Sequence, residues 1–443
     1  MADDRKAVEG AIDFAIQSAG AAPTSRIGAA GWIQGAGYDW LTGRINSGSS
    51  LGAEGSILNK LIQGGYGGSF ILPLSDKGAG EVDLVPLVGT GSATFTRATT
   101  ATTVNSAGLI VSVASGTPRS YYDPTTLAYR GYLAEGARTN LCLQSSDLSA
   151  ADWLIDGGTK TANFSTSPDG TTNAGRYVTA AVANLRQVIT VTASTQYTFS
   201  FYAKANGGTQ ASYRVYNITG GADIVPITSY FSSINSSTWT RITVSFTTPV
   251  GCTSIGVYMN SNASADTLLW GMQVEAGAFT SSYIPTTTAS VPRNADVLTY
   301  PFSGNADTTV GSAYAELSTF NTGAAVANPA AVNFGNGGRT LFLLTGAAVT
   351  SIGCFDSTNA ISKTGLSSMA TASRKRASSW GSGLLVTGDG LTTQSGSFDG
   401  SMGTSTEIAI GNNGGIEQWF GTIRNVRIYQ TQLSSAQLQT ITA

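Results

Sequence analysis

Short stretches in which apolar and polar residues alternate recur along most of this chain, and they constrain its fold more than any other feature. Thr240-Arg-Ile-Thr-Val-Ser-Phe246 shows the pattern, with Ile, Val and Phe at every second position. A period of two places the apolar side chains on one face of a β-strand. Gly and Asn residues separate such strands at intervals of roughly ten to twenty residues, which favours antiparallel two-sheet sandwiches.

The alternating segments predict where the strands lie. In the first half of the strand-rich region they predict strands over residues 186–191, 197–203, 212–216, 240–246, 255–259 and 268–274. Nearer the C-terminus they predict strands over 340–344, 383–387, 408–410 and 421–429. A short helix is predicted over 433–441, with Ser434 as its N-cap and Leu438 and Ile441 packing inward.

The chain is predicted to be mainly β, with two antiparallel β-sandwich domains after a short, helical, Gly-rich N-terminal region. Helices are predicted at residues 1–19 and 53–63, each followed by glycine. The predicted parts are an attachment region at 1–85, a β-rich connector at 86–141, a first sandwich at 142–291 and a second sandwich at 292–443.

Composition excludes several classes of partner. Charged residues make up 11% of the 443 residues, well below the roughly 25% usual in soluble domains. The net charge of −2 provides no field that would attract nucleic acid or anionic lipid. Nucleic-acid binding is therefore not expected. Membrane insertion is not expected either, because no stretch approaches the roughly 18 consecutive apolar residues of a membrane-spanning helix.

The residue types also limit the chemistry. The chain has no histidine, which excludes Ser-His-Asp triads and imidazole zinc sites. A glycosidase would need two carboxylates, but Glu81-Val-Asp-Leu-Val-Pro86 lacks the third acid of the concanavalin-like glycosidase strand. The other acids considered sit singly beside Gly or Asn, as turn residues do: Asp356, Asp389, Asp399, Glu407 and Glu417. We therefore expect no enzyme and no cofactor, with structural calcium at the 167–170 or 398–400 turn as an open alternative.

Four segments follow one another in an order that resembles a family of bacteriophage virion proteins, mostly tail-fibre or surface-appendage components. They are Phe95-Thr-Arg97, Glu135-Gly-Ala-Arg-Thr-Asn140, Trp270-Gly-Met-Gln-Val-Glu-Ala-Gly277 and Tyr283-Ile-Pro-Thr286. The resemblance implies a carbohydrate-binding-module-like jelly roll, followed by a concanavalin- or laminin-G-like sandwich. It also implies a virion protein that is made in the host cytoplasm and exposed on the particle.

On that basis the N-terminal region is expected to dock on other virion proteins, and a homo-oligomer, with a trimer favoured, is expected to contact a host-surface glycan during adsorption. Two alternatives remain open at this point. One is a capsid decoration or tail-assembly protein without glycan binding, and the other is a polysaccharide depolymerase.

Candidate site residues follow from these expectations. Sugar binding needs an exposed aromatic ring together with amide, carboxylate or Arg groups. In the strand 212–217, alternation places Arg214 and Tyr216 on one face and Tyr213 and Val215 on the other. The predicted glycan contacts are Arg214, Tyr216, Asn217, Trp239, Trp380 and Trp419. A structural network that pins the connector against the first sandwich is predicted for Arg97, Glu135, Arg138 and Glu275.

Overall fold

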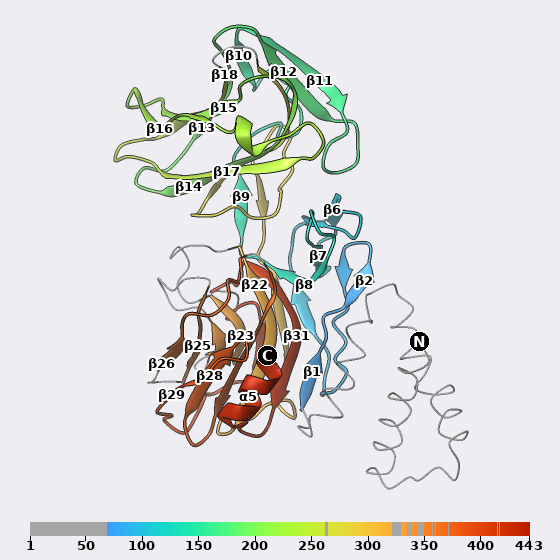
Figure 1. Ribbon diagram of the computed structural model, residues 1–443, viewed down its shortest axis with the longest axis vertical. Coiled ribbons are helices and arrows are strands. Elements are labelled where there is room, and N and C mark those ends of the chain that lie inside the picture. Colours follow the sequence, from blue (N-terminus) through green and yellow to red (C-terminus); the bar gives the residue numbers. More distant parts are fainter. Residues whose placement is uncertain are drawn as a thin grey trace, which may run out of the picture.

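The computed structural model describes residues 69–443 except 262–264, 321–328, 335–338, 343–349, 357, 359, 371, 414 and 416. Its strands pair antiparallel throughout the described residues, which confirms the predicted mainly-β class. Two sandwiches lie end to end in Figure 1, and the chain passes from one to the other through a narrow region. The helices predicted at 1–19 and 53–63 lie outside the described residues.

The upper sandwich in Figure 1 consists of two five-stranded sheets. The β15 sheet has the order β10 (Leu154–Asp156), β13 (Ala183–Thr190), β18 (Ser254–Ser261), β15 (Ser212–Asn217) and β16 (Ala222–Ser229). The β14 sheet has the order β11 (Thr159–Ser165), β12 (Ala174–Thr179), β19 (Ala265–Ala276), β14 (Gln196–Gly208) and β17 (Thr240–Thr247). A 3-10 helix, η2, covers Phe231–Ser233.

The lower sandwich also has two sheets. One follows the order β29 (Gln394–Gly396), β28 (Leu384–Gly388), β27 (Arg374–Trp380), β22 (Gly311–Thr319), β31 (Gly421–Tyr429), β8 (Tyr129–Ala134) and β7 (Ser120–Tyr122), and β1 (Phe70–Leu72) also pairs with β31. The other follows β26 (Ala360–Lys363), β25 (Ile352–Phe355), β24 (Arg339–Phe342), β23 (Ala330–Phe334), β30 (Glu407–Ile410), β21 (Val297–Pro301) and β4 (Thr94–Thr96).

The upper sandwich is an insertion within the lower one, because the lower sheets take strands from both sides of it in the sequence. β1, β7 and β8 join the sheet of β31, and β4 pairs with β21. The chain leaves through β9 (Arg138–Asn140) and returns through β20 (Val291–Arg293), and these two strands pair with each other. We call the two parts the inserted sandwich and the base sandwich.

This pairing corrects the expected division of the chain. Residues 70–72 belong to a sheet of the base sandwich rather than to an attachment region. The segment 86–141 is likewise not a separate connector, since its strands β4, β7 and β8 complete both base sheets. Two short strand pairs form separate two-stranded sheets: β5 (Ala101–Val104) with β6 (Ile110–Val113), and β2 (Asp76–Gly78) with β3 (Glu81–Val82).

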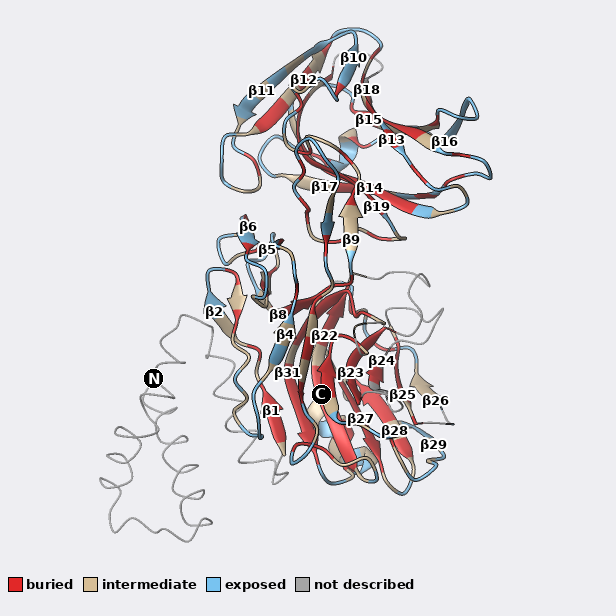
Figure 2. Ribbon diagram, turned by 180° about the vertical axis from the view of Figure 1, so that it is seen from behind, coloured by how far each residue is buried: buried red, intermediate tan, exposed pale blue. Residues whose placement is uncertain are grey.

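The hairpin β5–β6 packs against the outer face of the β14 sheet. Val104 and Ile110 of the hairpin form one buried cluster with Trp270 of β19 and with Tyr283. This contact covers one end of the β14 sheet, whereas β10 at the edge of the β15 sheet is exposed along its length (Figure 2). The two sheets of the inserted sandwich therefore differ in what they offer to other molecules.

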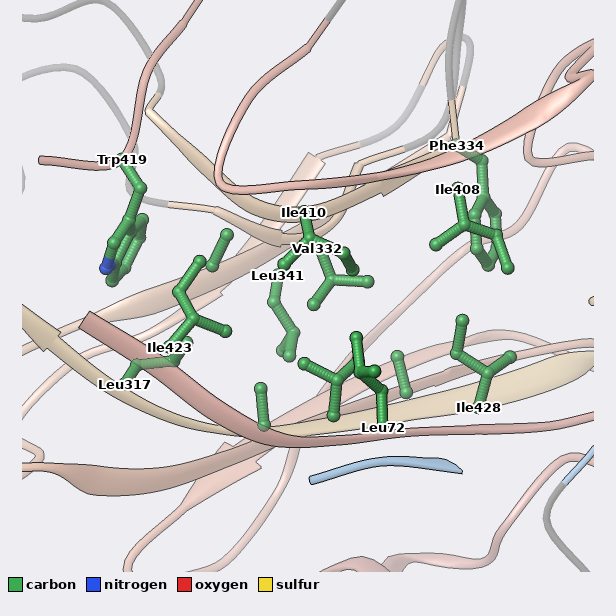
Figure 3. Packing of buried hydrophobic residues seen from close by; sticks show 14 of the residues in the cluster. Leu72, Leu317, Val332, Phe334, Leu341, Ile408, Ile410, Trp419, Ile423 and Ile428 are labelled. Atoms are coloured by element: carbon green, nitrogen blue, oxygen red, sulfur yellow. The ribbon is translucent and has the colours of Figure 1, made fainter. Parts of the chain in front are cut away.

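The base sandwich encloses a large apolar core between its two sheets. Figure 3 shows Leu72 of β1 among side chains from both sheets, including Leu317 and Ile410, and all three are buried at 0% exposure. Leu72 lies in this core because β1 pairs with β31 in register, with Leu72 opposite Val426. The apolar triplet Phe-Ile-Leu at residues 70–72 is thus part of the fold.

Replacing Leu72 with alanine is expected to lower the free energy of unfolding of the base sandwich by about 2–5 kcal/mol, the usual cost of a cavity left by a buried leucine. Leu391 is 43% exposed, and its replacement by alanine is expected to cost about 0.5 kcal/mol or less. Chemical denaturation of both variants measures the difference. Equal, small effects would show that residue 72 lies outside the core.

The C-terminal helix α5 (Ser435–Thr442) packs on the outer side of β27 and β28. Its N-cap is Ser434, whose hydroxyl accepts a hydrogen bond from the Gln437 backbone N–H, and Leu438 is fully buried. The predicted cap and inward leucine are therefore confirmed. Within the described part of the chain, no helix combines the length and apolar character needed to cross a bilayer.

Candidate functional site

The β15 sheet turns one side of its strands toward the core of the inserted sandwich. Leu185 of β13, Val257 of β18 and Val215 of β15 all have 0% exposure there. Because successive side chains in a strand point to opposite sides, their neighbours in the sequence face outward. The sheet therefore has a defined outer face.

Three side chains lie in one row across that outer face. Arg186 of β13 is directly opposite Tyr258 of β18, and Tyr258 is directly opposite Arg214 of β15. Tyr216 stands two residues after Arg214 on the same side of β15. The two arginines are thus on strands that flank the strand of Tyr258, about 10 Å apart if each strand spacing is roughly 4.8 Å.

Each arginine is paired with an aspartate at a sheet edge. Arg186 donates through Nη1 to Asp156 of β10, and Arg214 donates through Nε to Asp223 of β16. All four side chains keep solvent contact, with 29% and 47% exposure for the first pair and 26% and 37% for the second. Ion pairs this exposed contribute little to stability.

The guanidinium groups also contact the aromatic rings. The Cζ atom of Arg214 lies 4.3 Å from the ring centroid of Tyr216 and 5.5 Å from that of Tyr258. The Cζ atom of Arg186 lies 5.7 Å from the Tyr258 ring. The two rings meet edge to face at 6.4 Å. We call these four residues, with Asp156 and Asp223, the Arg–Tyr face.

A glycine makes room for the central ring. Gly256 lies two residues before Tyr258 on β18, and a Cβ atom at that position would come within 2.5 Å of the Tyr258 ring. The ring therefore lies along the backbone of its own strand, which leaves Tyr258 only 7% exposed. The Tyr216 side chain lies beside this row and is more exposed than that of Tyr258.

The face offers donors, acceptors and aromatic surface within a small area. The two guanidinium groups carry N–H donors, the two carboxylates accept, and a phenol can do both. Rings beside such groups suit a flat, hydroxyl-rich molecule, whose C–H surface packs on a ring while its hydroxyls reach the polar groups.

Comparison with known proteins points to the same part of the chain. Residues 149–266 match the family model of a carbohydrate binding domain. All six residues of the Arg–Tyr face lie within this matched segment. No curated protein matches the chain as a relative.

Solved structures similar to the chain include carbohydrate-binding modules and a phage protein. A CBM61 module in complex with β-1,4-galactotriose is 13% identical, with a TM-score of 0.23, and 30% of this chain aligns with 97% of that one. The CBM22 tandem from Paenibacillus barcinonensis Xyn10C is 11% identical, with a TM-score of 0.25, over 68% of this chain and all of that one. The enzymatically active domain of tailspike protein 4 from bacteriophage CBA120 is 16% identical, with a TM-score of 0.26. That alignment spans 31% of this chain but only 21% of the tailspike chain.

The structure brings two of the predicted glycan contacts together, Arg214 and Tyr216, on the face that alternation assigns to them. Asn217 requires a correction. It is 7% exposed, and its Oδ1 accepts a hydrogen bond of 2.8 Å from the Gly220 backbone N–H. Its side chain therefore shapes the turn after β15 instead of facing a ligand.

Trp239 lies apart from the Arg–Tyr face, on the β14 sheet side of the inserted sandwich. Its Nε1 donates to the Thr166 carbonyl at 3.1 Å, and the Lys204 ammonium lies 5.4 Å from its ring. It packs beside the cluster formed with the hairpin β5–β6. Trp239 therefore cannot act together with Tyr216 on one ligand molecule bound to the Arg–Tyr face.

Trp380 and Trp419 are corrected as glycan contacts, because both are buried at 0% exposure in the base core. Their indole N–H groups are bonded internally, to the carbonyls of Asp307 at 3.0 Å and Ser318 at 2.7 Å. Neither ring has a free face for a sugar. Large aromatic residues in a sandwich of this width fill the space between the sheets.

The predicted structural network lies where the two sandwiches join. Glu135, at the end of β8, is fully buried and 2.9 Å from both Arg119 and Arg293. Its carboxylate also accepts hydrogen bonds from the backbone N–H and hydroxyl of Ser282 in the inserted sandwich, at 2.7 and 2.6 Å. Burial alone would raise the pKa of Glu135, but Arg293, Arg119 and Ser282 outweigh it and hold the pKa at about 2.

The carboxylate of Asp296 extends the network to Arg97, one of the two predicted arginines. Asp296 is paired with Arg97 at 2.9 Å and with Arg119, and all three are buried. The Arg97 guanidinium also donates to the Ala114 carbonyl at 2.6 Å. Two carboxylates thus bind three arginines from the segments before and after the insertion.

Arg138 and Glu275 form a separate pair nearby, with 3.5 Å between Nε and Oε2. The Arg138 guanidinium lies 5.3 Å from the ring of Phe279 in the inserted sandwich and 4.5 Å from the ring of Phe420 in the base sandwich. The two rings are in edge contact at 4.9 Å. This arginine therefore joins the two sandwiches.

Three of the acids named for catalysis or calcium, Glu81, Asp169 and Asp399, have local partners. Glu81 lies 3.5 Å from Lys77. Asp169 and Asp399 accept hydrogen bonds from backbone N–H groups two residues on, as turn residues do. Among the described residues, no group of three or more His, Cys, Asp or Glu side chains could hold a metal ion.

Sequence reasoning missed Asp156, Arg186 and Asp223. A signal existed for Asp223, because a hairpin turn through Gly220 and Gly221 would place it opposite Tyr216, as observed. Asp156 and Arg186 meet only because β10 pairs with β13. That pairing joins residues 30 positions apart and left no local signal.

Proposed function

We propose that this protein binds glycans through the Arg–Tyr face of the inserted sandwich. The observation that carries the proposal is the coincidence of two independent results. The segment that matches a carbohydrate binding domain contains an outer sheet face where paired arginines surround two tyrosine rings. Hydroxyl-rich pyranose rings match this combination of stacking surface and charged hydrogen-bonding groups.

We further propose that the protein is a bacteriophage virion component, a tail fibre or surface appendage that contacts host-surface glycans during adsorption. The order of the Phe95, Glu135, Trp270 and Tyr283 segments supports this role. In this proposal residues 1–68 attach the protein to other virion proteins, and the inserted sandwich is exposed outside the particle. A homo-oligomer, with a trimer favoured, presents several faces at once, and linked copies raise avidity by orders of magnitude over a weak single site.

The test is binding of the full-length protein to a panel of host-surface polysaccharides and defined oligosaccharides, followed by calorimetry for the best ligand. We expect saturable binding to at least one saccharide. A protein that binds virion proteins but no saccharide would be a decoration or assembly protein. Release of new reducing ends from a bound polysaccharide would instead identify a depolymerase.

Gly256 gives a more specific prediction for this function. Replacing it with alanine forces the Tyr258 ring to move, because the new Cβ would meet that ring at 2.5 Å. We expect about tenfold weaker saccharide binding, since a displaced ring changes the packing of both arginines. A side chain at Gly251 would meet no atom within 4 Å of its Cβ, and the backbone there has a positive φ of 75°. Asparagine tolerates that conformation, so Gly251→Asn is a suitable control without effect on binding.

A further inference from the structure

The Arg–Tyr face carries balanced charge. Its two arginines are each held by one aspartate, Arg186 by Asp156 and Arg214 by Asp223. These pairs stand at the two ends of the row that has Tyr258 at its centre. Each positive charge on this face therefore lies next to a negative charge.

We infer that Asp156 and Asp223 determine specificity, by making the face select uncharged saccharides over acidic ones. This inference rests on the proposed glycan binding and adds the class of glycan. It depends on the two aspartates rather than on the aromatic rings. The partly exposed Tyr216 ring would stack on neutral and acidic pyranoses alike.

A neutral sugar can use both members of each pair without separating them. Arg214 uses its Nε–H for Asp223, and a guanidinium has four further N–H donors. The Asp223 carboxylate is 37% exposed, and a carboxylate can accept several hydrogen bonds. A sugar hydroxyl can therefore accept from the arginine while a neighbouring hydroxyl donates to the aspartate.

An acidic sugar meets a different situation. Its carboxylate would have to displace Asp156 or Asp223 from an arginine, or lie beside that aspartate. Either arrangement places two negative charges close together, and like charges at an interface are a strong source of discrimination. Because exposed ion pairs add little stability, the two aspartates can be changed without loss of the fold.

The experiment compares the full-length protein with its Asp156→Asn/Asp223→Asn variant by calorimetry. The neutral probes are xylohexaose, mannohexaose, cellohexaose and β-1,4-galactotriose, and the acidic probes are trigalacturonate and a hyaluronan hexasaccharide. We expect the unchanged protein to bind at least one neutral probe tenfold or more tightly than either acidic probe. In the variant, we expect tenfold or greater gain for an acidic probe and less than tenfold loss for the neutral one.

The matched control is Asp266→Asn. Asp266 holds Arg176 on the β14 sheet through two hydrogen bonds of 2.8 and 2.6 Å, so the substitution removes a similar pair away from the Arg–Tyr face. It should leave the ratio of neutral to acidic binding unchanged. A preference of the unchanged protein for acidic probes, or an unaltered ratio in the double variant, overturns the inference while glycan binding stands. Failure of the unchanged protein to bind any neutral probe overturns the inference, and failure to bind any saccharide of the wider panel overturns glycan binding as well.

Discussion

Replacing Glu135 with alanine is expected to lower the free energy of unfolding by about 3–5 kcal/mol, the usual cost of removing one partner from a buried charge network. Arg119 and Arg293 would lose the carboxylate that lies 2.9 Å from each of them. Ser282 would lose the acceptor for its backbone N–H and its hydroxyl. Chemical denaturation followed by circular dichroism measures the effect.

The control is Glu81→Ala. Glu81 forms an exposed ion pair with Lys77 at 3.5 Å, and its replacement is expected to change stability by about 0.5 kcal/mol or less. If the two glutamate variants lost similar, small amounts, the buried network would not hold the sandwiches together as described.

The same carboxylate predicts a dependence of stability on pH. The pKa of Glu135 is lowered from 4.5 to about 2 in the folded protein, so folding favours the charged form. Its contribution is complete above about pH 4.5 and is lost as the pH falls toward 2, and it amounts to about 3 kcal/mol at most. The difference in unfolding free energy between the protein and its Glu135→Gln variant should therefore shrink over that range. A difference that stays constant from about pH 6 to about pH 3 would contradict the lowered pKa.

Removing both Arg214 and Tyr216 by alanine substitution is expected to weaken saccharide binding by about 100-fold. A charge-assisted hydrogen bond to a ligand contributes about 1.5–3 kcal/mol, an aromatic contact adds about 1 kcal/mol, and about 1.4 kcal/mol corresponds to a factor of ten. Calorimetry with the best ligand of the panel measures the loss. The fold should be retained, because both side chains lie outside the core of the inserted sandwich.

Arg176 and Phe164 provide a matched control on the other sheet. The Arg176 guanidinium lies 4.7 Å from the Phe164 ring and is paired with Asp266, much as Arg214 is placed against Tyr216 and Asp223. The double alanine variant at these two positions should bind saccharide as the unchanged protein does. If it lost binding while the Arg214/Tyr216 variant kept it, the site would lie on the β14 sheet.

The alternation of apolar and polar residues is sufficient to predict individual strands and the sides to which neighbouring residues point. It predicts a strand over 421–429 with the bounds that β31 has, because its apolar residues and flanking glycine are all local signals. Alternation also separates Arg214 and Tyr216 from Val215 correctly. The same alternation places Asn217 on the side of Val215, and Gly220 and Gly221 mark a turn, so the burial of Asn217 was within reach of local signals.

The insertion could not be predicted from local pattern. Phe70 is opposite Ile428, and Tyr132 is opposite Ile423, so strands at the two ends of the described chain share a sheet. Nothing in either segment specifies so distant a partner. Similarly, Trp380 and Trp419 are predicted as glycan contacts from their residue type, and only the pairing of the base sheets shows that they lie inside.

A crystal structure of the full-length protein with its best-binding saccharide tests the glycan site most directly. The sugar should lie across β13, β18 and β15, with one ring against Tyr216 and hydroxyls within hydrogen-bond distance of Arg186 or Arg214. A saccharide bound instead to the β14 sheet or to the base sandwich, with the Arg–Tyr face empty, would contradict the assignment.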